Sequence, residues 1–457
     1  MNFFATVPKF CCLLILFSDQ IFAEEAKVQI TLEVAYAKAV EDAPMLAAAK
    51  FRVDSAKAEK SAAIGQLLPQ VMLRGSWSDN KIEYDSFAAD LYDDQKYQGE
   101  RYGFQARQTL FNVSRVYEVE RQNALLDRSK DDLDQTQLDL LIAVTEAYMN
   151  IQVADADAAQ FQKEFDALVQ QLEQATALYE RSLISVTELL ETQSRMDAVK
   201  ADLIRAQGAA DITRERLSQF TGDREIEPMP LRPAIQLPST VASAQAAARL
   251  AMEVSPAVLA EEDSVSAARA AVDREKGSWW PEVDLLITQQ YSDVGFDNLT
   301  SPPRTTESVS IEINYPLIQG GSGRARIRGA EAEFYAARNE LETIKREIQT
   351  TARSAWLRLR AAAERLTAAT QAVETSEVSV AAATESVRIG SARNTDLLLA
   401  LAQETRAQRD LSHAHQLRAM AWLELELVTG SKPNAVASVL SDALVGVGVA
   451  SVSGSVP

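Results

Sequence analysis

The chain has 457 residues and a formal net charge of −19 at pH 7. This length would accommodate about three ordinary domains. The acidic balance excludes a nucleic-acid partner, because phosphate binding requires a basic surface.

The N-terminus has the features of a secretory signal. Lys9 precedes the apolar run Phe10–Phe17, and Ala23 offers a small residue for cleavage before two glutamates. The run is too short to cross a bilayer as a helix, so it predicts a signal peptide over residues 1–23, with a buried core strand as the alternative. Both cysteines of the chain lie inside this segment, which excludes disulfides from the mature protein.

The rest of the chain is an internal duplication. A second proline lies 212 positions after each of Pro44 and Pro69. The segments Thr187–Leu190 and Phe220–Gly222 each have a similar segment 208 positions later. A period this long predicts two copies of one whole structural unit rather than a solenoid. The expected organisation is a first repeat over 24–222, a proline-rich linker over 223–240, a second repeat over 241–430, and a flexible C-terminal tail over 431–457.

Each repeat contains two short segments that alternate between apolar and polar residues, typical of half-buried strands. The four segments are Val71–Ser78, Tyr102–Leu110, Val283–Tyr291 and Ser308–Leu317. Each is about ten residues long, enough for a tilted strand to cross a membrane. Aromatic residues gather at the strand ends, as expected for the interfacial girdles of a membrane barrel or for the core of a soluble sandwich.

The remaining sequence predicts long helices. Apolar or small residues recur every seven positions from Leu126 to Tyr179 and again from Leu341 to Val387, which indicates coiled-coil packing. The stretches that contain these rows, about 113–181 and 322–388, hold no proline. At 1.5 Å per residue each helix would extend about 100 Å. Thr31–Gln66 and Thr187–Phe220 predict helices of half that length, and two of these stacked end to end would match one long neighbour. The expected fold class is therefore mainly α with a β-barrel portion on a hollow helical column.

Four strands alone cannot close a sheet in lipid, because unpaired edge groups cost several kcal/mol each. The smallest oligomer expected to form a closed barrel is a trimer with about twelve strands and a water-filled lumen. The chain resembles the TolC-like outer-membrane efflux proteins across about Thr31–Lys432. The duplication, the strand entry Leu68–Val71 and two similar turns, Arg181–Leu190 and Ile389–Leu398, carry the resemblance.

The resemblance implies a homotrimer in outer-membrane lipid with a long periplasmic helical tunnel. It also implies a passive exit duct for efflux or type I secretion, working with a periplasmic adaptor and an inner-membrane transporter of the ABC or RND type. Two rivals are a periplasmic adaptor, which would need a single helical hairpin in a β-rich domain, and a soluble coiled-coil scaffold without a pore.

The two turns hold the candidate site. Glu188 and Asp396 are candidates for acidic rings at a narrow entrance, with helix capping by the preceding threonines as the alternative. In the family pattern an acid matches Asp396, a second falls on Leu399 and a basic residue falls on Ala392. The candidate adaptor-docking residues are Ser182, Leu183, Ser185, Thr187, Gly390, Ser391, Arg393 and Thr395.

No catalytic set is apparent, so we expect neither an enzyme nor a cofactor. The only histidines, His413 and His415, point to different faces of a helix, which opposes a metal site. The segment Gly320–Gly323 lacks the Gly-Lys-Ser/Thr ending of a phosphate loop and predicts a strand-to-helix turn. The three arginines that follow it are expected to remain at the membrane interface.

Overall fold

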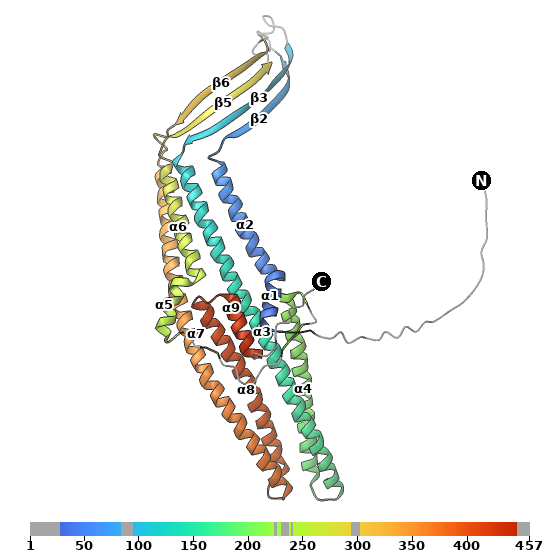
Figure 1. The fold of residues 1–457 in the computed structure, drawn as a ribbon. Helices are drawn as coiled ribbons and strands as arrows, with labels where there is room; N and C mark the ends of the chain where they lie inside the picture. The colour runs from blue at the N-terminus through green and yellow to red at the C-terminus, as the bar shows by residue number, and fades with distance from the viewer. Residues whose placement is uncertain are drawn as a thin grey trace, which may run out of the picture.

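The computed structural model of the chain describes residues 28–83, 95–223, 226–229, 237–238, 241–293 and 302–445. The predicted signal peptide lies outside this range. The molecule is long and narrow, with a β-sheet at one end and two helical hairpins at the other, which we call the tip end (Figure 1). Among the described residues, none of the helices combines the length and apolar character needed to cross a membrane.

The helices follow the duplication. The first repeat contributes α1 (Leu32–Asp42), α2 (Pro44–Gly65), α3 (Val113–Glu180) and α4 (Val186–Thr221). The second contributes α5 (Ala244–Val254), α6 (Pro256–Gly277), α7 (Ser322–Arg388) and α8 (Asn394–Val428), followed by α9 (Pro433–Val445). The two long helices, α3 and α7, have 68 and 67 residues, which confirms the predicted uninterrupted spans.

Pairs of shorter helices run along the long ones. Near the sheet, α2 and α6 pack against α3, whereas α4 and α8 pack against α3 nearer the tips (Figure 1). Helix α7 likewise packs against α6 and then α8. The expected end-to-end stacking beside a long neighbour is therefore confirmed.

The helix predicted over Thr31–Gln66 is broken. Ala43 adopts an extended conformation (φ −66°, ψ 118°) between α1 and α2, and Ser255 does the same (φ −66°, ψ 123°) between α5 and α6. Each residue precedes a proline, whose ring disfavours the helical conformation of its predecessor. Pro44 and Pro256 then begin the following helices, at a position where the missing N–H costs nothing.

Four strands form one antiparallel sheet in the order β2-β3-β5-β6. Their bounds are β2 Gln70–Ile82, β3 Gln95–Phe111, β5 Glu282–Asp293 and β6 Arg304–Asn314. The strands are confirmed, but β2 and β3 are longer than predicted: β2 continues past Ser78, β3 begins before Tyr102, and the added residues pair as far as Ile82 with Gln95. The pairing of Leu73 with Phe104, of Ala106 with Ile287 and of Ile287 with Val309 places the predicted apolar rows of all four strands on one face.

A second, two-stranded sheet had no sequence signal. Val28–Ile30 (β1) pairs in parallel with Ile226–Pro228 (β4), and runs of three residues are too short to show an alternating pattern. The buried hydroxyl of Tyr148 donates a hydrogen bond to the Ile30 carbonyl (3.0 Å) and accepts one from the Met229 N–H (3.1 Å), which ties this pair to α3. Burial raises the pKa of Tyr148 to about 12, so the phenol stays protonated.

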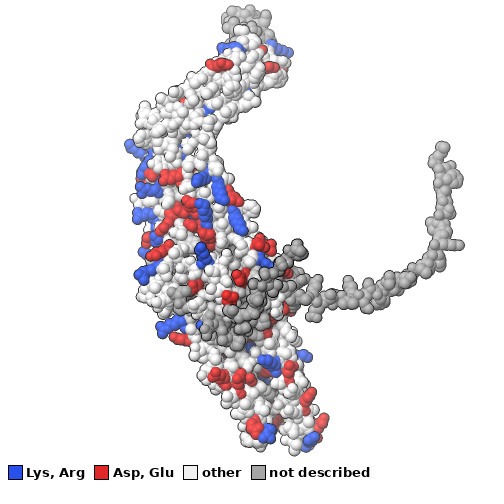
Figure 2. Space-filling view, in the orientation of Figure 1, with Lys and Arg blue, Asp and Glu red and all other residues white. Residues whose placement is uncertain are grey.

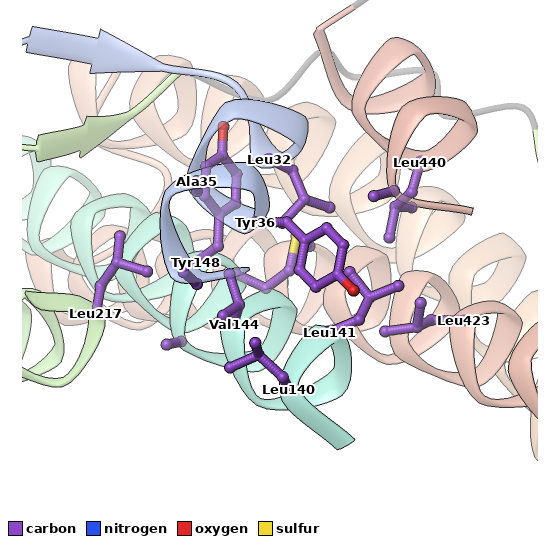
Figure 3. Packing of buried hydrophobic residues seen from close by; sticks show 14 of the residues in the cluster. Leu32, Ala35, Tyr36, Leu140, Leu141, Val144, Tyr148, Leu217, Leu423 and Leu440 are labelled. Atoms are coloured by element: carbon purple, nitrogen blue, oxygen red, sulfur yellow. The ribbon is translucent and has the colours of Figure 1, made fainter. Parts of the chain in front are cut away.

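The main hydrophobic core lies midway along the molecule, where both repeats meet (Figure 3). Leu32, Leu141, Leu423 and Leu440 are fully buried there and come from α1, α3, α8 and α9. The prediction of a flexible tail over 431–457 is therefore wrong for 433–445, because α9 buries an apolar face in this core. Residues 446–457 lie outside the described range.

Candidate functional site

Two similar turns lie side by side at the tip end, one between α3 and α4 and one between α7 and α8 (Figure 1). In the first, Ser182 has a positive φ of 59°, and the Leu183 N–H donates to the Leu178 carbonyl (2.9 Å). In the second, Gly390 has φ 75°, and the Ser391 N–H donates to the Ser386 carbonyl (2.9 Å). The duplication thus reproduces one left-handed helix ending twice, with a serine in place of the usual glycine in the first copy.

The predicted capping by threonine is wrong at both turns. The hydroxyl of Ser185 accepts from the Glu188 N–H (3.2 Å), so Ser185 caps α4. In the second turn the Asp396 carboxylate accepts from the Arg393 N–H (3.0 Å). Each threonine lies two residues after the N-cap, at the second helical position.

The structure places all the predicted docking and ring residues on the turns or in the first helical turn after them. Leu183 is 66% exposed. Glu188 and Thr395 are half-buried, and the exposed members are Ser182, Leu183, Ser185, Thr187, Gly390, Ser391, Arg393 and Asp396. Acidic and basic side chains are intermixed at the tips (Figure 2). These exposed groups lie on the surface of the tip end.

A buried polar contact joins the two hairpins just inside the tips. The Asn394 amide donates to the Thr192 hydroxyl (3.1 Å), and the Gln171 amide donates to the Asn394 carbonyl oxygen. Thr192 is fully buried and Asn394 is 8% exposed. Sequence reasoning missed this contact. A difference between the two repeats could have indicated it, because the residue equivalent to Asn394 in the first repeat, 208 positions earlier, is an apolar valine.

Packing and ion pairs extend the connection away from the tips. Leu168, Val199 and Leu398, from α3, α4 and α8, form one buried cluster. Beside it the buried carboxylate of Glu164 accepts from Arg195 (2.5 Å), which connects α3 to α4. These contacts hold the ends of the hairpins together within one chain.

Further from the tips, a groove of about 510 Å³ lies among α3, α4 and α8. Arg409 from α8 donates to Asp157 of α3 (2.9 Å), and its guanidinium lies 4.5 Å from the centre of the Phe161 ring. The ion pair raises the pKa of Arg409, so its positive charge is permanent. Within the described part of the chain, no group of three His, Cys, Asp or Glu residues could hold a metal ion.

The sheet is open at both edges. Strands β2 and β6 are its outermost strands, and every residue of β6 is exposed. The exposure includes large apolar side chains, Val309 at 73%, Ile311 at 64% and Ile313 at 67%. A lone sheet of this kind leaves an apolar face and two rows of backbone groups without partners.

Comparison with known proteins gives a consistent result. The sequence pattern of the family described as "Outer membrane efflux protein" matches residues 35–223 and 247–431. The chain is 26% identical to the alkaline protease secretion protein AprF of Pseudomonas aeruginosa, over 86% of this chain and 83% of AprF. It is 23% identical to the outer membrane protein TolC of Vibrio cholerae, over 87% of this chain and 90% of TolC.

Among solved structures, the CmeC outer membrane channel of Campylobacter jejuni has the same fold. It superposes with a TM-score of 0.77 over 96% of this chain and 98% of CmeC, at 12% identity. Matches over both halves identify the protein as an outer-membrane export channel with a large periplasmic part. Membership of a family of channels confirms that the protein is not an enzyme and excludes the adaptor and scaffold alternatives. The chain therefore belongs to the family of outer membrane efflux proteins.

Proposed function

We propose that three copies of this chain join their sheets into a twelve-stranded barrel and act as a passive exit duct. The duct would work with a periplasmic adaptor and an inner-membrane transporter of the ABC or RND type, which supplies the energy. The observation that carries the proposal is the four-stranded sheet with two open edges and one apolar face. The domain boundaries expected from the duplication, with repeats over 24–222 and 241–430, belong to the same proposal.

Edge pairing between chains explains the sheet. In a bilayer each unpaired N–H or C=O of β2 and β6 would cost several kcal/mol, so the edges must meet partners. Eight strands, from two chains, would give an interior filled by side chains, whereas twelve leave room for water. The apolar face of β6 would then contact lipid.

An exposed stripe of small residues on α7 supports the same assembly. Below the first turns of the helix, Ala336, Thr343 and Thr350 are all exposed and repeat at intervals of seven. Small side chains at this spacing allow a second helix to approach closely. The neighbouring chain would supply that helix and complete the wall of the tunnel.

The conductance of a planar bilayer tests the duct. Purified protein should give discrete, voltage-driven ion currents, because a trimer encloses water across the lipid. Protein that inserts into the bilayer and passes no ions would contradict the proposal. The protein secretion named for AprF supports placing this chain in a type I secretion system.

The tips would form the gate at the periplasmic entrance. Adaptor binding would favour a separated arrangement of the hairpins over the closed one, as a shift between two populations. Contacts such as Asn394 with Thr192 would hold the closed state. Breaking them would therefore raise the open fraction.

Three copies of Asp396, and of Glu188 beside it, would place acidic rings at the entrance and favour cations. The variant D396N should lower the ratio of cation to anion permeability, measured as the reversal potential in a salt gradient. D54N is the control, since Asp54 is an exposed carboxylate on α2, far from the tips. Equal reversal potentials for D396N and the unaltered protein would remove the ring assignment.

The exposed turn residues would dock the adaptor. Because Ser182 and Gly390 have positive φ, bulky replacements there would distort the turn itself. Leu183, which is 66% exposed, gives a cleaner test. L183E should abolish export in a host lacking the natural channel, whereas I204E, at a residue 61% exposed and further along α4, should not. Normal export by L183E would contradict the docking assignment.

A further inference from the structure

A basic and apolar surface lies where the sheet meets α7. We define the β6–α7 junction as residues 315–328, from the end of β6 through the first two turns of α7. It contains Arg324, Arg326 and Arg328, and no acidic residue occurs between Glu312 and Glu331. A local charge of +3 in a chain of net charge −19 is a marked reversal. In Figure 2, Lys and Arg side chains gather along the left edge below the sheet, where α7 lies.

The apolar face of the sheet continues into the junction. Beyond Ile313, Leu317 is 73% exposed and Ile318 is 91% exposed. Trp280, two residues before β5, is 60% exposed and packs edge-on against Phe111 with ring centres 6.5 Å apart. Exposed aromatic residues at a strand end are typical of the membrane–water interface. The surface that contacts lipid therefore ends at the junction.

The start of α7 is fixed in position at this boundary. Gly323 lies so close to Trp279 that a Cβ there would be 2.9 Å from the indole ring. Counted from Ser322, Arg324 and Arg328 stand about 3 and 9 Å along the helix axis. The headgroup layer on each side of a bilayer is roughly 5–7 Å thick, so both guanidinium groups reach it.

The arginines differ in their partners. Arg326 is held by Glu275 (3.2 Å) and by the side chain of Gln319 (3.0 Å). Arg324 and Arg328 are exposed and make no ion pair or side-chain hydrogen bond with the described residues. They are four residues apart, so they lie on the same face of α7. Two guanidinium groups on one face suit a phosphate, which accepts paired N–H bonds from arginine.

We propose that Arg324 and Arg328, with Leu317 and Ile318, bind an anionic phospholipid of the periplasmic leaflet. The arginines would hold the headgroup phosphate and the two apolar side chains would contact the start of an acyl chain. The inference deepens the proposed function, because it requires the sheet to span the membrane. Charge complementarity selects an anionic lipid over a zwitterionic one.

Fluorescence quenching of the full-length protein in vesicles tests the site, because Trp280 is exposed and precedes Glu282, which pairs with Asn314 at the end of β6, next to the junction. The probes are brominated phosphatidylglycerol and brominated phosphatidylethanolamine, compared in mixed vesicles. The unaltered protein should prefer phosphatidylglycerol, and R324E/R328E should lower that preference roughly tenfold. R324Q/R328Q should lower it less. Soluble glycerol phosphate should not compete, since it lacks the acyl chain.

R338E/R346E is the matched control, because both arginines are exposed on α7 and lie about 24 and 36 Å from its start. It changes the net charge equally and should keep the lipid preference. Unchanged preference in R324E/R328E, or equal losses in both double variants, would overturn the inference. Loss of the oligomer with unchanged lipid preference would assign the arginines to a subunit contact instead, and so would overturn it too. Absence of quenching by either lipid in the unaltered protein would instead show that the sheet is not in the membrane.

Discussion

Replacing Asn394 by alanine should release the hairpins at the tips. The substitution removes two side-chain hydrogen bonds, one to Thr192 (3.1 Å) and one from Gln171. At about 1 kcal/mol each, their loss favours the separated state by about 2 kcal/mol per chain. That free energy corresponds to a roughly thirtyfold change in the ratio of closed to open hairpins. Thr192 still donates to the Glu188 carbonyl (3.1 Å), so its own donor stays satisfied.

The fraction of time that single channels spend open in a planar bilayer measures this effect. N394A should raise the open fraction, and N394A/T192V should add little to it, because both changes remove the same contact. Q162A is the control, since within the described part of the chain the Gln162 side chain bonds only to Asp166 of α3 (2.9 Å) and does not join the hairpins. An open fraction in N394A that equals that of Q162A would refute the reasoning.

Three further predictions concern stability, measured by thermal unfolding of the purified protein. S182G should stabilise and G390A should destabilise by about 1 kcal/mol each, because both positions have positive φ; shifts of the same sign would contradict this. L440A in α9 should cost about 2–5 kcal/mol, whereas a flexible tail would give no change. Burial, and then the charge of Asp263, raises the pKa of Asp131 from 3.8 to about 6. The contribution of Asp131 to the free energy of unfolding is therefore favourable below pH 4 and is lost as pH rises through 6. The variant D131N should be more stable than the unaltered protein by about 1 kcal/mol at pH 8, after discounting for solvent screening, and equally stable at pH 4. Equal gains in stability at both pH values would contradict the assignment.

The sequence predicted those features that repeat over many residues. Heptads fix the long helices α3 and α7, alternation fixes the four strands, and the duplication fixes both tip turns. Features that depend on one residue or one distant partner were missed. The break at Ala43 follows from the proline after it. The capping hydrogen bonds that Ser185 and Asp396 accept depend on which of several neighbouring polar side chains lies close enough to a backbone N–H.

Long-range contacts were beyond the reach of any local pattern. The polar link through Asn394 joins residues more than 200 positions apart, and the pairing of β1 with β4 involves three residues on each side. The helical spacing of apolar residues in α9 was present in the sequence, but the many small residues of this segment made it hard to recognise. The ring and docking roles of the tip residues depend on neighbouring chains, so they stay predictions.

The account depends most on edge pairing between chains, because the sheet of one chain cannot close on itself. The mass of the detergent-extracted particle, measured by native mass spectrometry, tests this directly. We predict three copies of the chain, in which each β6 edge meets the β2 edge of a neighbour. A folded, detergent-soluble particle that contains a single copy would contradict the account.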